Sequence, residues 1–244
     1  MNTYNTAIEI TNLSLKIGKK SLLENINWTV RPGEKWLVYG MNGCGKTTLL
    51  SCIAGVQRFD TGILKVFDET YSNINYPILK SKIGFISSSF FDKFYSKETV
   101  LDIVLSGKYG YLGLSELLTL EDIHLAKEYL KILDLQDKLY FNFSSLSKGE
   151  RQNVIIARAL MSSCELLLLD EPFNGLDIYH QVFVSKIIDY FSRFSDKTLI
   201  YVTHQLRNLP SFFNLCLLMK NGSILQEGPL KTTFSSKNLS QFYI

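Results

Sequence analysis

The stretch that most constrains the fold is a glycine-rich loop between a strand-like and a helix-like segment. It reads GMNGCGKTT from Gly40 to Thr48 and matches the pattern G-x-x-x-x-G-K-[ST]. The preceding KWLVYG is typical of a buried strand, and the following KTTLLSCIA predicts a helix that ends at Gly55. In that context the backbone N–H groups of the loop can surround phosphate oxygens at a helix N-terminus, where the helix dipole favours anions. A plain glycine-rich turn is the alternative, and it requires no such context.

We expect this loop to bind the phosphates of a nucleotide. The expected binding residues are Gly40, Asn42, Gly43, Cys44, Gly45, Lys46, Thr47 and Thr48. Lys46 would reach the β- and γ-phosphates, and the Thr47 hydroxyl would ligate Mg²⁺. For Cys44, a positive loop backbone could lower the pKa of the thiol. The interpretation of Cys44 as a tolerated small residue is favoured.

An acidic pair follows a second strand-like run. In LLLLDEP, Asp170 and Glu171 stand where a buried strand ends. Asp170 is suited to Mg²⁺, and Glu171 is suited to orienting and deprotonating a water molecule. His204 ends the next strand, LIYVTH, and is expected beside the same phosphates, although a histidine at a strand end is more often structural. Solvated strand ends are the alternative, but the phosphate loop earlier in the chain favours a joint site.

The order of strand-like and helix-like segments predicts an α/β fold. AIEITNLSL and INWTV predict antiparallel strands, KIGFISS a further strand, and LCLLMKNGSILQEG a hairpin that turns at Asn221-Gly222. From Thr99 to about Tyr140 the pattern is helical, as in LEDIHLAKEYLKIL. We therefore expect one domain over residues 1–244, with a core at about 1–90 and 146–244 and a helical insertion at about 91–145.

Composition excludes several classes of protein. The 46% hydrophobic content suffices for a large core, and a formal charge of +3 is too even for a protein that coats nucleic acid. Four cysteines without metal or redox spacing fit a reducing compartment. No signal pattern or membrane-spanning run is found. We expect a soluble cytoplasmic protein that can dock at the inner face of the cell membrane.

The helix start in SLSKGERQNVIIARAL has an unexpected glycine. Ser147 and Glu150 have the capping-box spacing, in which each side chain binds a free backbone N–H of the other residue. Gly149 lies inside the first turn, where glycine destabilises a helix relative to alanine. We interpret this glycine as a sign that another group approaches the backbone closely.

With these residues together, the chain resembles the ATP-binding cassette (ABC) ATPases over nearly its full length. The resemblance is carried by the phosphate loop, the signature LSKGE, LLLLDEP, NGLD and VTH in that order. It implies a P-loop NTPase with a RecA-like parallel sheet core, an N-terminal antiparallel β subdomain and an inserted α-helical subdomain. It also implies ATP and Mg²⁺ as ligands.

The same resemblance assigns roles to residues. Glu171 would be the general base, His204 the γ-phosphate sensor and Lys46 a catalytic contact. The signature residues Ser147, Gly149 and Glu150 would complete the ATP site of a second subunit in a head-to-tail homodimer or hetero-pair. Asp177 would lie in the loop that links the two sites.

Finer features and two departures bear on the partner. VLDIVLSGKYGYLGL and GLDIYHQ look like the cassettes of metal-chelate importers of siderophore, cobalamin or haem type. Ile17 stands where the family carries an aromatic residue that stacks on adenine. Ser87 and Ser88 replace the usual Pro-Gln, whose glutamine touches Mg²⁺, so Ser88 is expected at the metal. That segment is similar to stand-alone cassettes of molybdenum-transport and photorepair type.

Three functions therefore compete. The favoured one is an ATPase subunit that energises a transporter with separate membrane permease subunits. The alternatives are a stand-alone soluble ATPase acting on nucleic acid or another cytosolic target, and a regulatory module that hydrolyses little ATP. The complete set of Lys46, Asp170, Glu171 and His204 argues against the regulatory module. A nucleic-acid partner is disfavoured by the charge balance.

Overall fold

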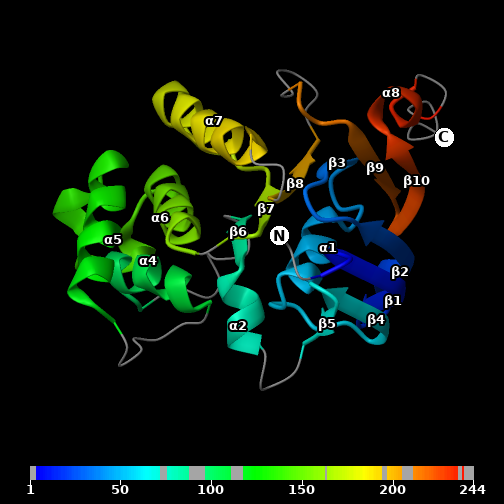
Figure 1. Ribbon diagram of the computed structural model, residues 1–244, viewed down its shortest axis with the longest axis horizontal. Helices are drawn as coiled ribbons and strands as arrows, with labels where there is room; N and C mark the ends of the chain where they lie inside the picture. Colours follow the sequence, from blue (N-terminus) through cyan, green and yellow to red (C-terminus); the bar gives the residue numbers. More distant parts are fainter. Residues whose placement is uncertain are drawn as a thin grey trace. The chain divides into compact units, whose positions relative to one another are not determined.

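The computed structural model (Figure 1) describes residues 4–71, 76–87, 97–110, 118–162, 164–193, 197–204, 211–235 and 238. The chain forms two compact units. The first comprises Met1–Asn73, Leu168–Glu171 and Ser192–Ile244, and the second comprises Ile74–Leu167 and Pro172–Phe191. The second unit begins earlier and ends later in the sequence than the helical insertion expected at about 91–145.

An antiparallel sheet begins the first unit. Its strands are β1 (Ile8–Ile17), β2 (Lys20–Val30), β4 (Thr61–Val66) and β5 (Glu69–Thr70), in the order β2-β1-β4-β5. The two strands predicted from AIEITNLSL and INWTV are confirmed as β1 and β2, which pair antiparallel from Ile8↔Val30 to Ile17↔Lys20. The sequence analysis missed β4, which pairs with the other edge of β1.

The mixed sheet carries the phosphate loop. In the first unit its strand order is β10-β9-β3-β8-β7. These strands are β3 (Lys35–Gly40), β7 (Leu166–Asp170), β8 (Thr198–Thr203), β9 (Leu215–Lys220) and β10 (Ser223–Pro229). Because β3 runs parallel to both β8 and β9, the carboxyl ends of these strands lie at one edge of the sheet. The strand before the loop is thus confirmed.

Two turns of the first unit follow the local rules that predicted them. Helix α1 (Lys46–Ile53) follows β3 and ends before Gly55, which has a positive φ of 66°. The β9–β10 hairpin turns at Asn221 and Gly222, with φ of 49° and 81°. A short helix, α8 (Leu230–Thr233), follows this hairpin.

The second unit is mainly helical. It contains α2 (Tyr76–Ser81), β6 (Ile83–Ser87), α4 (Val100–Tyr109), α5 (Leu120–Ile132), the 3₁₀ turns η1 (Gln136–Lys138) and η2 (Phe143–Ser145), α6 (Lys148–Leu160) and α7 (Ile178–Arg193). The helical pattern of LEDIHLAKEYLKIL is confirmed as α5. Among the described residues, no helix is sufficiently long and apolar to span a bilayer.

The backbones of helices α4 and α6 lie in direct contact. A Cβ added at Gly107 of α4 would lie 1.9 Å from the carbonyl oxygen of Arg158 in α6. Glycine is therefore required at this crossing. The packing fixes α6, which carries the signature residues at its N-terminus, on the helical framework of the second unit (Figure 1).

Candidate functional site

The phosphate loop packs closely against the backbone of neighbouring strands. A Cβ at Gly40 would meet the Met219 carbonyl oxygen at 2.4 Å, and one at Gly45 would meet the Leu22 carbonyl oxygen at 2.7 Å. Gly45 also has a φ of 106°, which side-chain-bearing residues rarely adopt. Gly43 has a φ of 79° but open space around it. The glycines at 40 and 45 therefore let the loop pack directly against neighbouring backbone.

The ammonium group of Lys46 lies among the carbonyl oxygens of this loop. Its Nζ donates to the Gly40 oxygen at 2.8 Å and the Met41 oxygen at 3.0 Å, and the residue is only 5% exposed. Helix α1 begins here without a side-chain cap, whereas α4, α5 and α6 are capped by threonine or serine. An uncapped helix start beside a fixed ammonium group fits an anion.

Cys44 is a packing residue of the loop. Its side chain is buried, and burial raises the pKa of the thiol although Lys46 lies nearby. Its carbonyl oxygen accepts the Gly222 N–H at 3.0 Å, which ties the loop to the β9–β10 turn. The favoured interpretation of Cys44 agrees with this burial. Asn42 is exposed, and Thr48 is half-buried in the first turn of α1.

The two expected metal ligands of the first unit lie together. The Thr47 Oγ1 donates to the Asp170 Oδ1 at 3.1 Å, across 123 residues of sequence. Asp170 ends β7 and is buried, whereas Thr47 is exposed. A hydroxyl and a carboxylate oxygen are the donors that Mg²⁺ prefers. These residues therefore fit the metal that the sequence analysis expects.

Glu171 and His204 also meet. The Nδ1 of His204 lies 2.6 Å from the Glu171 Oε1, and both side chains keep solvent access, with 35% and 24% exposure for His204 and Glu171. Glu171 has a φ of 49°, and its N–H donates to the Val202 oxygen at 3.1 Å. A non-glycine residue in this region carries strain of about 1–3 kcal/mol, which is common at functional sites. A carboxylate reached by water and oriented by an imidazole can accept a proton.

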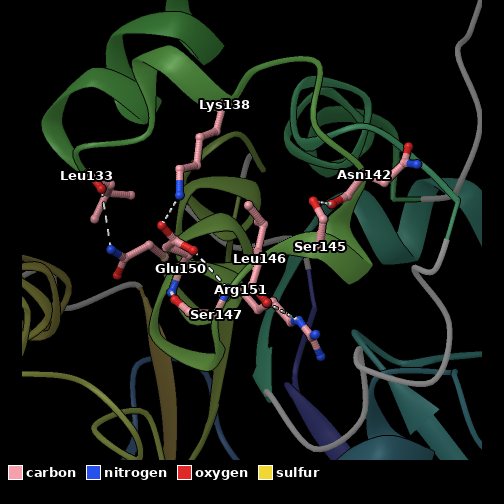
Figure 2. A network of polar contacts seen from close by, with 9 residues as sticks. Leu133, Lys138, Asn142, Ser145, Leu146, Ser147, Glu150 and Arg151 are labelled. Carbon is pink, nitrogen blue, oxygen red and sulfur yellow. Dashed lines mark hydrogen bonds and ion pairs between the residues drawn. The ribbon is translucent and has the colours of Figure 1, made fainter.

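In the second unit, the capping box at the start of α6 is confirmed. The Ser147 N–H donates to the Glu150 Oε2 at 2.8 Å, and the Glu150 N–H donates to the Ser147 Oγ at 3.3 Å. The ammonium of Lys138 faces Glu150 (Figure 2) and lowers the pKa of that carboxyl. Nothing in the sequence near the signature indicates Lys138, because it approaches from η1.

The described residues do not require glycine at position 149. A Cβ there would meet only the Gly175 carbonyl oxygen at 3.4 Å, which is an ordinary contact, and the backbone of Gly149 is not left-handed. The contrast with Gly107 on α4, where a Cβ would collide with backbone, is large. Any requirement for a small residue at 149 therefore has its source outside the described residues.

Asp177 is held at the start of α7. Its Oδ1 accepts the His180 N–H at 2.9 Å, and its Oδ2 lies 2.8 Å from the His180 Nδ1. The His180 N–H is the main reason why the pKa of Asp177 is lowered. The sequence analysis missed His180, although the i, i+3 spacing from an aspartate at a helix start would have indicated it.

Two expected site residues remain apart from these contacts. Ile17 ends β1 and is 59% exposed, so its side chain is accessible to a ligand. Ser88 lies outside the described residues, directly after the buried Ser87 that ends β6.

Comparisons with a family model and with known proteins point to the same family. The sequence model of the family described as ABC transporter matches residues 23–174. The molybdate import ATP-binding protein MolC of Haemophilus influenzae is 31% identical over 98% of this chain and 88% of its own length.

Solved structures agree with that match. An ABC transporter of proposed metal-chelate type, in an inward-facing conformation, is 30% identical and covers 98% of this chain and 89% of its own, with a TM-score of 0.71. A dimeric ATP-binding cassette in a post-hydrolysis state, bound to ADP and Pi, is 25% identical with a TM-score of 0.74, and covers 91% of this chain and 98% of its own.

Proposed function

The chain belongs to the ABC transporter family as an ATP-binding ATPase cassette, and we propose that it drives transport through separate permease subunits by hydrolysing Mg²⁺-bound ATP in a head-to-tail dimer. The observation that carries the catalytic part of this proposal is the pair of contacts Thr47–Asp170 and Glu171–His204 within one compact unit. Each pair joins residues far apart in sequence.

The loop supplies binding and charge. Its backbone N–H groups and the uncapped start of α1 receive the phosphates, and Lys46 adds a charge-assisted contact to the β- and γ-phosphates. Thr47 and Asp170 would hold Mg²⁺, which would neutralise charge on the phosphate oxygens. The ammonium of Lys46 is already positioned by the loop carbonyls, so little reorganisation precedes binding.

Glu171 and His204 carry out the proton chemistry. Glu171 accepts a proton from the attacking water, and the imidazole of His204 orients the carboxylate and approaches the γ-phosphate. The strained backbone of Glu171 fixes the direction of its side chain, because its N–H is tied to the Val202 carbonyl.

The signature of a second subunit completes each ATP site. Ser147 presents its hydroxyl, and Gly149 its bare backbone, at the N-terminus of the 13-residue helix α6. The described residues leave room for a Cβ at position 149, yet the residue there is glycine. This supports the approach of a group from another subunit to that backbone. Asp177, fixed by His180, would lie in the loop between the two sites of the dimer. The partner is a second copy of this chain or a similar cassette.

The transported substrate is a metal complex or metal oxyanion that is imported. Two of the similar proteins support this class, one being a molybdate import protein and the other an ABC transporter of proposed metal-chelate type. On this proposal the chain works at the cytoplasmic face of the membrane, where it docks on its permease.

Steady-state hydrolysis of ATP by the purified chain, with Mg²⁺ or with excess chelator, tests the catalytic part. We expect Mg²⁺-dependent hydrolysis that Asp170→Asn lowers by about tenfold or more, since the side-chain oxygen that would bind the metal loses its negative charge. Asp68→Asn is the matched control, because Asp68 is a carboxylate of the first unit that accepts hydrogen bonds from the N-terminal residues Asn5 and Thr6 and is not part of the phosphate loop or the acidic pair. Equal activity of the two variants would contradict the assignment.

A second experiment tests the transport part. The permease encoded beside this cassette, if co-expressed, should co-purify with it, and the complex in vesicles should take up a metal complex or oxyanion only with ATP. An absence of any permease gene neighbour, together with full activity of the isolated chain, would favour the stand-alone alternative.

A further inference from the structure

Helix α6 carries two adjacent buried amide side chains. Gln152 is fully buried and Asn153 is 3% exposed, one turn after the signature residues. Each donates through its NH₂ group to a backbone carbonyl, and each leaves its amide oxygen without a partner among the described residues. The two donated bonds tie α6 to backbone carbonyls of other segments.

The two amides bind different parts of the second unit. The Asn153 Nδ2 donates to the Leu133 oxygen at 3.3 Å, at the end of α5. The Gln152 Nε2 donates to the Pro172 oxygen at 3.0 Å, and Pro172 is buried. Pro172 is joined by its peptide bond to Glu171. Only Gln152 therefore acts on the segment that carries the catalytic carboxylate.

The backbone of Glu171 needs such an anchor. It has a φ of 49° and precedes a proline, and the residue before a proline has an already restricted conformational range. On its amino side Glu171 is held by the bond from its own N–H to the Val202 oxygen. On its carboxyl side the carbonyl of the next residue, Pro172, accepts the hydrogen bond from Gln152. Loss of one anchor would let the strained backbone relax, which would turn the carboxylate away from His204.

The same helix begins with the residues proposed to contact the second nucleotide. Gln152 follows the capping pair Ser147 and Glu150 on α6, and Lys138 fixes Glu150 from outside the helix (Figure 2). A shift of this helix start would be passed to Pro172 through one buried bond, because a packed helix moves as a rigid element.

We infer that Gln152 is a positioning residue for Glu171, which ties the signature helix to the catalytic carboxylate through the Pro172 carbonyl. The inference rests on the proposed role of Glu171 as the base. On this inference a buried residue that belongs to neither the phosphate loop nor the acidic pair sets the rate of the chemical step. Energetic coupling of this kind has to be demonstrated by variants rather than by proximity.

The test compares Gln152→Met with Asn153→Leu. Both changes replace a buried amide on α6 by an apolar side chain of similar shape, so both should change thermal stability by similar amounts. Only Gln152→Met should lower kcat, by about tenfold or more, because a small misplacement of a catalytic group has large effects. ATP affinity of Gln152→Met should stay within about twofold of wild type, because the loop residues that bind phosphate are untouched.

Two readouts separate positioning from a structural role. In a Glu171→Gln background, Gln152→Met should still form the ATP-dependent dimer, which places the loss in chemistry rather than assembly. If Gln152→Met fails to fold, Gln152→Glu replaces it. Its carboxyl can donate the same bond when protonated, so its kcat relative to wild type should rise as the pH falls.

Equal kcat of Gln152→Met and Asn153→Leu, or a Gln152→Glu ratio that does not change with pH, would overturn the inference. Absence of ATP hydrolysis by the wild-type chain would instead contradict the proposed function. The two failures are therefore distinguishable.

Discussion

Replacing Gly149 by alanine should affect stability and function in opposite directions. Glycine inside a helix destabilises it by about 0.5–1 kcal/mol relative to alanine. At position 149 the new Cβ would meet only the Gly175 oxygen, at 3.4 Å, so little of that gain is lost to crowding. We expect a net gain of ~0.5 kcal/mol in the free energy of unfolding, which corresponds to a rise in Tm of about 1–2 °C for a chain of this size.

The same methyl group should block the ATP-dependent dimer. On our proposal the Gly149 backbone approaches the γ-phosphate bound by the other subunit, and a methyl group at that distance excludes the phosphate. Hydrolysis should fall by about 100-fold, which corresponds to the loss of an oxyanion-type contact of ~3 kcal/mol. Binding of ATP to the isolated chain should be unchanged, because the phosphate loop lies elsewhere in the sequence.

The assays are thermal unfolding, equilibrium ATP binding and steady-state hydrolysis of matched preparations. Gly107→Ala is the control, because its Cβ would lie 1.9 Å from the Arg158 oxygen. That variant should unfold at a clearly lower temperature than wild type. A Gly149→Ala chain with a Tm several degrees below wild type, or with wild-type hydrolysis, would refute the reasoning.

Three further predictions concern single residues of the nucleotide site. Lys46→Ala should lower ATP affinity and hydrolysis together by about tenfold or more, through loss of a charge-assisted contact of ~1.5–3 kcal/mol; equal hydrolysis in matched assays would mean that the loop is misassigned. Ile17→Tyr should tighten ATP, but not free triphosphate, by about 1–3 kcal/mol of base stacking, and the wild type should accept GTP about as well as ATP; a strong wild-type preference for ATP in competition assays would show that another residue recognises the base. Ser88→Gln should raise basal hydrolysis measured without a permease, since a bridging water at the serine costs immobilisation entropy that a direct contact avoids; fast wild-type turnover that this change does not raise would support a stand-alone enzyme.

Features governed by local physics could be predicted from sequence. The capping box at Ser147 and Glu150, the hairpin turn at Asn221-Gly222 and the helix α5 all form as their patterns indicate. Each depends on residues that are close in sequence and that satisfy a backbone requirement of their own. The strand before the phosphate loop was predictable because a strand buried on both faces needs a continuous apolar run.

Features that depend on distant residues were out of reach. Strand β4 carries little pattern of its own and exists because it pairs with β1. The bonds from Lys138 to Glu150 and from Gln152 to Pro172 join segments whose proximity only the tertiary fold determines. The left-handed backbone of Glu171 is likewise imposed by its surroundings, since no residue preference indicates it.

The candidate site itself was partly predictable. The motifs placed Thr47, Asp170, Glu171 and His204 at the ends of strands or the start of a helix, and the structure brings them together in two pairs. The pairing of these four side chains could not be predicted, because the sequences of the strands do not determine their order in a parallel sheet. The roles of these residues in catalysis remain predictions, as does the role of Ser88, which lies outside the described residues.

The most direct test of the proposed mechanism is the molar mass of Glu171→Gln in solution, measured by size-exclusion light scattering with and without saturating ATP and Mg²⁺. Loss of the base leaves phosphate binding intact, so the bound ATP should persist and join two chains. We predict one chain of 27.9 kDa without ATP and twice that mass with ATP. Addition of Gly149→Ala to this variant should abolish the larger species. A chain that stays monomeric at saturating ATP, or a dimer that is indifferent to Gly149→Ala, would contradict the head-to-tail arrangement.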